Sequence, residues 1–210
     1  MVIAVANGRL SQFGRLYHPK LAAFLTRQYS PAMIQALTTT PTILILAGKR
    51  DGTLDPLAER AGVSHKCRVP IMGKPLLQWV IEAVAPTFPD ARVLISIHDS
   101  EVIADLPGVV DLKAAGRLLL CTAQSGIVES VEAAIAEAGG KSAFPLMITT
   151  ADNVLAEPDY LRGVHEAALA SKGDAVVVLA TRESIRAAHP DGQRKFYKIG
   201  RASCRERVCT

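Results

Sequence analysis

TILILAGKRDG, residues 42–52, joins a continuous apolar run to a loop of glycines and charged residues. A short run of Thr, Ile and Leu without polar alternation is typical of a strand that is buried on both faces of a sheet. Gly48 and Gly52 permit a close backbone approach, while Lys49 and Arg50 supply positive charge. Exposed backbone N–H groups and cations in such a loop can bind phosphate. The stretch therefore predicts a buried strand followed by an anion-binding loop.

The rest of the chain repeats this alternation of strand and helix. Further apolar runs predict strands at residues 92–97, 117–121, 145–149 and 175–179. Helical patterns flanked by Pro or Gly occupy residues 75–85, 125–139 and 158–173. The alternation predicts an α/β fold, a three-layer α/β/α domain with a mostly parallel sheet and right-handed crossovers.

Small, polar or charged residues follow three of the predicted strands directly, at 47–52, 122–126 and 149–153. In parallel sheets the ligand binds outside the carboxyl ends of the strands. Because these ends meet at one edge, we expect the three segments to form a single site there.

Composition excludes several classes of protein. With 210 residues, 22.4 kDa and 49% hydrophobic residues, the chain is long enough to bury the core of one domain. No apolar run reaches the length of a membrane span, so we expect a cytoplasmic protein without a membrane partner. The cysteines show no CxxC spacing, which argues against a zinc site and against a disulfide framework.

The net charge of +4 resides at the two ends of the chain. Residues 1–40 carry +4 and residues 199–210 carry +2, which leaves −2 for residues 41–198. A general nucleic-acid binder would carry its basic surface on the folded part. The charge distribution therefore argues against a nucleic-acid partner.

Both ends also depart from the composition of the centre. We predict that residues 1–40 are an extension outside the domain. Two origins of this extension stay open: an organelle transit peptide, or a segment upstream of a true start at Met33. The tail 199–210 has no apolar period, and IGRASCRERV resembles the translation of a common sequencing adapter. We expect a non-native tail and a domain, 41–198, that is incomplete at its C-terminus; the alternative is a genuine basic tail.

Common catalytic motifs are absent from the sequence. Gly73 and Lys74 are followed by Pro75, so they do not form a P-loop, and there is no GxGxxG fingerprint. The sequence also lacks a GxSxG nucleophile elbow and an HExxH metal motif. Dinucleotide-binding, P-loop, serine-hydrolase and metalloprotease functions therefore lose support.

Three segments in order resemble a known superfamily. ILILAGKR at 43–50, HKCRVPIMGKPLLQWVIEAV at 65–84 and LMITTADNVL at 146–155 are similar to motifs of the nucleotidyltransferase superfamily, especially its molybdenum-cofactor guanylyltransferase-like group. The resemblance covers about residues 42–180. It implies a glycosyltransferase-A-like, Rossmann-like nucleotidyltransferase fold.

The resemblance also implies roles for the first two segments. Ala47 and Gly48 would line the base and the phosphates, and Arg50 would contact the leaving pyrophosphate. Lys66 would neutralise the α-phosphate, and Lys74 would support the same loop. Lys66 and Arg50 are therefore the expected catalytic residues.

The later segments are expected to bind the base and the metal ion. By the same resemblance, Gln124 and Gly126 would frame the base with Ser125 beside them, and Asp152 would bind Mg²⁺. The implied reaction moves a nucleoside monophosphate from an NTP to a small phosphorylated or hydroxylated acceptor and releases pyrophosphate. Mg²⁺ is the implied cofactor, and the identity of the NTP, the acceptor and the oligomeric state stay open.

Simpler interpretations of these residues remain. Lys49 replaces the second glycine usual in the family, and the segment 51–65 is longer than in many relatives. Asp152 could cap a turn, and Lys66 and Lys74 could be solvated loop cations. The alternative function is a non-catalytic nucleotide-binding or regulatory domain with the same fold.

Overall fold

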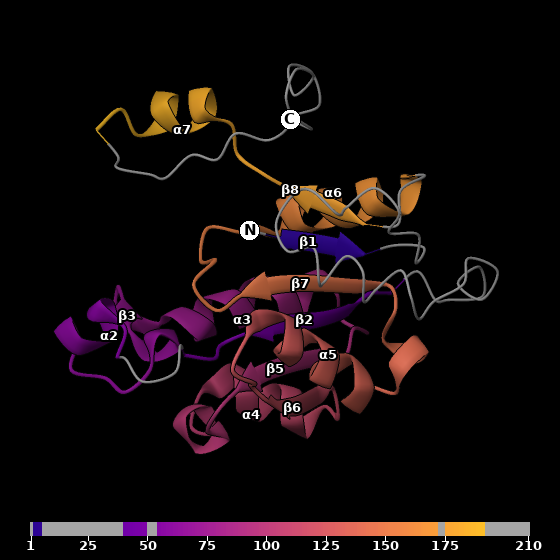
Figure 1. The fold of residues 1–210 in the computed structure, drawn as a ribbon, viewed down its shortest axis with the longest axis horizontal. Helices are drawn as coiled ribbons and strands as arrows, with labels where there is room; N and C mark the ends of the chain where they lie inside the picture. The colour runs from indigo at the N-terminus through magenta and orange to yellow at the C-terminus, as the bar shows by residue number, and fades with distance from the viewer. Residues whose placement is uncertain (1, 6–39, 50–53, 172–174, 192–210) are drawn as a thin grey trace.

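The computed structural model describes residues 2–5, 40–49, 54–171 and 175–191 (Figure 1). Its strands form a six-stranded sheet in the order β6-β5-β2-β7-β1-β8, with a separate two-stranded hairpin, β3-β4. The strands of the large sheet are β1 (Val2–Val5), β2 (Thr42–Leu46), β5 (Val93–Ile97), β6 (Leu118–Thr122), β7 (Leu146–Thr150) and β8 (Val176–Val178).

Four neighbouring strands of this sheet are parallel. β2 pairs with β5 on one side and with β7 on the other, and β5 pairs with β6. The apolar run of β2 is buried from Thr42 to Ile45, as expected for a strand covered on both faces. The predicted α/β fold with a mostly parallel sheet is confirmed.

Helices cover both faces of the sheet. Ile43 and Ile45 of β2 belong to a core shared with α3 (Leu76–Thr87), α4 (Pro107–Ala114) and α6 (Pro158–Ala170). Leu44, between them in sequence, points to the opposite face and belongs to the core beneath α5 (Ile127–Glu137). This alternation along one strand is what produces the three layers.

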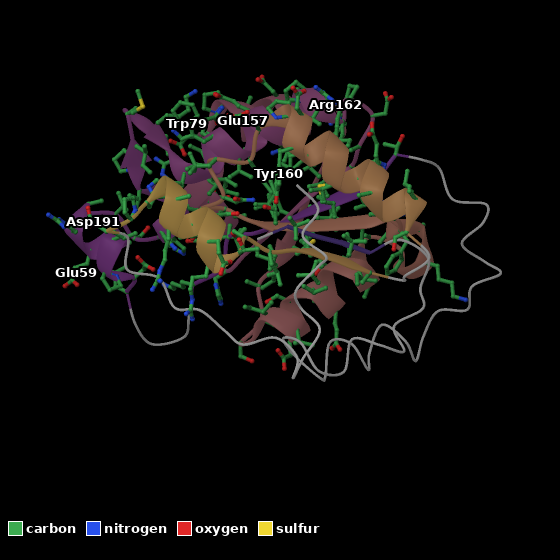
Figure 2. The ribbon with its side chains drawn as sticks, turned by 90° about the horizontal axis from the view of Figure 1, so that it is seen from above. Glu59, Trp79, Glu157, Tyr160, Arg162 and Asp191 are labelled. Carbon is green, nitrogen blue, oxygen red and sulfur yellow. The ribbon has the colours of Figure 1, made fainter. Side chains whose placement is uncertain are left out.

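Helices α3 and α6 lie next to each other on the first face. Tyr160 and Arg162 on α6 are exposed, and Trp79 on α3 is half-buried (Figure 2). Leu161 and Val164 of α6 point inward, because apolar residues three and four positions apart share a helix face. No helix in the described ranges is both long and apolar enough to cross a membrane.

Strand β1 is the exception to the parallel arrangement. Val2–Val5 lies between β7 and β8 and runs antiparallel to both. Four residues of the segment predicted as an extension, 1–40, thus belong to the sheet. The boundaries of the domain otherwise stay a prediction, and the tail 199–210 lies outside the described residues.

Short elements gather beyond the carboxyl end of the sheet, at the left of Figure 1. They are α2 (Pro56–Arg60), η2 (Lys66–Arg68) and the hairpin strands β3 (Pro70–Ile71) and β4 (Lys74–Pro75). Met72 and Gly73 form the hairpin turn with φ of 51° and 77°. Positive φ at both positions is the geometry of a tight two-residue hairpin. The remaining short elements are η3 (Ser100–Ile103), η4 (Gly140–Ala143) and α7 (Arg182–Ala188).

Candidate functional site

The parallel strands bring three loops together at one edge. Each loop begins by extending the sheet: Ala47 N–H donates to the Ser96 carbonyl at 2.8 Å, and Ala151 N–H donates to the Leu46 carbonyl at 3.0 Å. Ala123 N–H likewise donates to the Ile97 carbonyl at 3.0 Å. The residues after β2, β6 and β7 are therefore held by the same hydrogen-bond ladder that builds the sheet.

Gly48 lies where the loops after β2, β5 and β6 meet. A Cβ at this position would lie 3.0 Å from Ala123 Cβ and 3.3 Å from His98 Cε1, closer than most side chains tolerate. The next residue, Lys49, donates its backbone N–H to His98 Nδ1 at 3.3 Å. Ala47 is buried and Gly48 is exposed, so the loop turns from the core to the surface here. Arg50, the expected pyrophosphate contact, lies outside the described residues.

Lys66 and Asp152 form an ion pair across this edge. The Lys66 ammonium, at the start of η2, donates to Asp152 Oδ2, and Thr150 Oγ1 donates to Asp152 Oδ1 at 2.6 Å. The two charged side chains are 37% and 41% exposed, so both remain open to a ligand from solvent. Two residues 86 positions apart in sequence are thus brought into contact.

The contacts of Asp152 also set its acidity. Burial raises the pKa of this carboxyl, but hydrogen bonds from Lys66 and Thr150 lower it by more, so the pKa lies below its usual value. Asp152 is therefore an anion at neutral pH, as a metal ligand must be.

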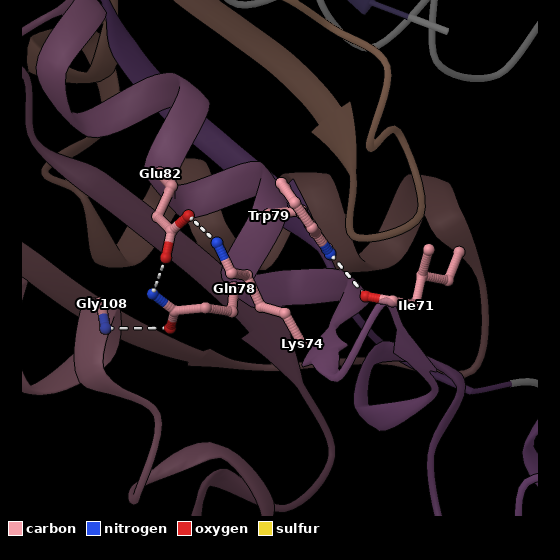
Figure 3. Close-up of polar contacts among 6 residues, drawn as sticks. All are labelled: Ile71, Lys74, Gln78, Trp79, Glu82 and Gly108. Carbon is pink, nitrogen blue, oxygen red and sulfur yellow. Dashed lines mark hydrogen bonds and ion pairs between the residues drawn. The ribbon is translucent and has the colours of Figure 1, made fainter.

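Lys74 is engaged elsewhere. Its Nζ lies 2.5 Å from Glu82 Oε2 and 3.9 Å from the centre of the Trp79 ring (Figure 3). Gln78 donates to Glu82 at 2.8 Å and accepts a bond from Gly108 N–H at 3.0 Å. The described contacts of Lys74 are thus with α3, and its expected support of the phosphate loop stays a prediction.

The loop after β6 is shaped by Ser130, a buried residue in the first turns of α5. Its Oγ accepts the Gln124 backbone N–H at 2.8 Å and donates to the Gly126 carbonyl at 2.7 Å. The Gln124 amide donates to the Thr122 carbonyl at 2.9 Å, and Ser125 is exposed. Gln124 to Gly126 thus form an ordered turn at the start of a helix, where the helix dipole favours an anion.

The donor set at this edge suits a magnesium ion that is shared with phosphates. Asp152 supplies a carboxylate, a hard oxygen donor, and the Thr150 hydroxyl donates a hydrogen bond that orients it. The described part of the chain contains no group of three or more His, Cys, Asp or Glu that could hold a metal ion alone. Mg²⁺ typically takes one or two protein carboxylates and completes its shell with phosphate oxygens and water. The residues fit that pattern and do not form an all-protein metal cage.

Sequence reasoning assigned no role to three residues of this site: His98, Ser130 and Thr150. Their types are common outside functional sites, and only Thr150 lies in one of the three segments that resemble the superfamily. Position offers the only available signal, because His98 and Thr150 stand at the carboxyl ends of predicted parallel strands.

Comparison with known proteins gives a family and a fold. The family model described as a MobA-like NTP transferase domain matches residues 43–208. A solved structure of a hypothetical transferase from Thermus thermophilus is 23% identical, with a TM-score of 0.52. The match covers 74% of this chain, and the chain spans 57% of the length of that structure. No curated protein matches the chain.

Proposed function

The chain belongs to the MobA-like NTP transferase domain family, and from that premise we propose that it moves a nucleoside monophosphate from an NTP to a small acceptor. The acceptor would carry a phosphate or hydroxyl group, Mg²⁺ would be the cofactor, and pyrophosphate would leave. The observation that carries the proposal is the contact between Lys66 and Asp152 at the carboxyl edge of the sheet. A cation that would bind phosphate and a carboxylate that would bind a metal ion stand side by side there.

The chemistry asks little covalent work of the protein. An acceptor oxygen attacks the α-phosphorus, a new P–O bond forms, and the bond from the α-phosphorus to the bridging oxygen breaks with that oxygen leaving on pyrophosphate. Such transfers are accelerated mainly by positioning and by neutralising negative charge. A bound Mg²⁺ would supply charge neutralisation at the phosphates.

The residues of the site divide these tasks. Lys66 would neutralise charge at the α-phosphate, and Asp152 would hold the metal ion. Gly48 has no side chain and would let phosphates approach the backbone after β2. The ordered turn from Gln124 to Gly126 would contact the base.

Pyrophosphate release tests this function. The full chain is incubated with each NTP, Mg²⁺ and a panel of small phosphomonoesters and alcohols, and pyrophosphate is measured by a coupled assay. We expect release with one NTP, and a loss of about 100-fold or more in Asp152→Asn, because the carboxylate that orients the metal is gone.

Asp159→Asn is the matched control. Asp159 lies on the exposed surface of α6 and pairs with Arg162. Its replacement by asparagine therefore changes the net charge by the same amount as Asp152→Asn but leaves the site unaltered. Equal turnover by Asp152→Asn and wild type would contradict the proposed role of Asp152. Nucleotide binding without any pyrophosphate release would instead favour the non-catalytic alternative.

A further inference from the structure

The two carboxylate oxygens of Asp152 accept hydrogen bonds from two different side chains. Oδ1 accepts from Thr150, the last residue of β7, whose backbone is fixed by pairing with Leu46 of β2. Oδ2 accepts from Lys66, whose flexible side chain reaches across from a separate segment, η2. A long lysine side chain can change rotamer at small cost, whereas the short β-branched side chain of Thr150 is restricted at χ1. Oδ2 is therefore the exchangeable position.

The charges of the pair oppose the binding of either ligand alone. A triphosphate without metal attracts Lys66, but drawing the ammonium away leaves the Asp152 carboxylate unpaired beside a polyanion. A divalent metal alone competes with Lys66 for Oδ2 and leaves an ammonium beside a dication. When both ligands bind, the metal pairs with Asp152 and the phosphate pairs with Lys66, so every charge has a partner.

We propose that the Lys66–Asp152 ion pair couples nucleotide binding to metal binding, with Lys66 occupying the metal's place on Asp152 until both ligands arrive. Thr150 is the positioning residue, because its hydrogen bond to Oδ1 holds the Asp152 carboxylate in place while Oδ2 exchanges Lys66 for the metal ion. This inference rests on the proposed function, since it assigns the metal and the phosphate to the same two residues.

Exposure sets the size of the coupling. Because both side chains are more than one third exposed, the pair is screened by solvent and breaks without a large cost. An exposed ion pair corresponds to a change in affinity of about twofold to fivefold, and removal of repulsion from a triphosphate adds to it. The coupling is therefore large enough to measure, and small enough for Lys66 to leave Asp152 when the ligands bind.

The first test measures metal-free NTP binding by calorimetry in EDTA, using the full chain and the NTP that wild type prefers with Mg²⁺. We expect Asp152→Asn to bind the metal-free NTP about threefold to tenfold more tightly than wild type, because Lys66 is already free. Adding Mg²⁺ should tighten binding less in this variant than in wild type. Asp159→Asn, which makes the same charge change away from the site, should behave as wild type.

The second test measures Mn²⁺ alone by electron paramagnetic resonance, as a spectroscopic probe for the metal position. Lys66→Met should bind Mn²⁺ about twofold to fivefold more tightly than wild type, because Oδ2 is free. Thr150→Val should weaken Mn²⁺ binding, and Thr150→Ser should restore it because the hydroxyl returns. Misfolding would weaken binding in any variant. It therefore cannot explain tighter NTP binding by Asp152→Asn or tighter Mn²⁺ binding by Lys66→Met.

The outcomes separate the coupling from the proposed function. Wild type that binds an NTP with Mg²⁺, together with variants that show neither gain, would overturn the coupling and leave the proposed function standing. Wild type that binds no NTP even with Mg²⁺ would overturn the proposed function and the coupling with it.

Discussion

His65 is a buried histidine directly before Lys66, and it is only 5% exposed. Its Nδ1 lies 2.9 Å from Ser64 Oγ, and its Nε2 has no hydrogen-bond partner among the described residues. Burial, followed by the positive charge of Lys49, lowers the pKa of His65 below its usual value. The folded protein therefore keeps this imidazole neutral at pH values where an unfolded chain would protonate it.

This lowered pKa predicts a loss of stability in mild acid. Above the unfolded pKa of about 6.5 both states are neutral and the stability is full. As the pH falls below that value, the unfolded chain takes up a proton that folded His65 does not, so the free energy of unfolding decreases until the folded pKa is passed. We measure the free energy of unfolding by urea denaturation at about pH 7.5 and about pH 5.5. Its decrease between the two pH values should be smaller in His65→Leu than in wild type.

His189→Leu is the control for this measurement. His189 is an exposed residue at the end of α7, so its replacement should leave the decrease unchanged. An identical decrease in His65→Leu and wild type would contradict the assignment of this acid sensitivity to His65.

At the scale of elements, two glycines in helices have opposite requirements. Gly108, in the first turn of α4, is buried against α3, and a Cβ there would lie 2.6 Å from Ile81 Cγ2. Gly163, inside α6, is exposed, and a Cβ there would meet nothing within 4 Å. The close approach of α4 to α3 therefore depends on Gly108, whereas Gly163 only lowers helix propensity.

The same substitution should change stability in opposite directions at these positions. Gly108→Ala should lower the free energy of unfolding by about 1–3 kcal/mol, because buried Ile81 must shift. Gly163→Ala should raise it by about 0.5–1 kcal/mol, because alanine loses less backbone entropy in a helix. Urea denaturation of both variants measures this, and a destabilised Gly163→Ala would show that α6 is constrained in a way the packing does not reveal.

The regular elements of this fold follow from local patterns. The strand predicted at 92–97 is β5, Val93–Ile97, and the helix predicted at 158–173 begins at Pro158 as expected and ends at Ala170. Continuous apolar runs and terminal prolines are local signals, so one sequence is enough to find them.

Two elements with short local signals were not predicted: α4 begins at a proline and β1 is an apolar run of four residues. Helix α4, Pro107–Ala114, is short, and its apolar residues Val109, Val110 and Leu112 do not repeat at helical spacing over several turns. Strand β1 depends on pairing with β7 and β8, which lie more than 140 residues later in the chain. Such pairing is a property of the tertiary fold and not of the four residues themselves.

At the scale of the whole molecule, the position of the site follows from topology while its contacts do not. Parallel strands place the residues after β2, β6 and β7 at one edge, so a sequence that predicts the strands also predicts that edge. The pairing of Lys66 with Asp152, and of Lys74 with Glu82, depends on how η2 and the hairpin lie beyond that edge. Local patterns do not encode those placements, because long loops can adopt many paths.

The proposed function requires that the carboxyl edge bind an NTP together with Mg²⁺. A thermal-shift panel of ATP, GTP, CTP, UTP and dTTP, each with and without Mg²⁺, measures this binding. A ligand that binds only the folded state stabilises it by about 2.7 kcal/mol at a hundredfold excess over its Kd, which is readily measured. We expect one NTP to raise the melting temperature more with Mg²⁺ than without it. A chain that melts cooperatively and whose melting temperature is shifted by none of the five nucleotides would show that this edge does not bind an NTP.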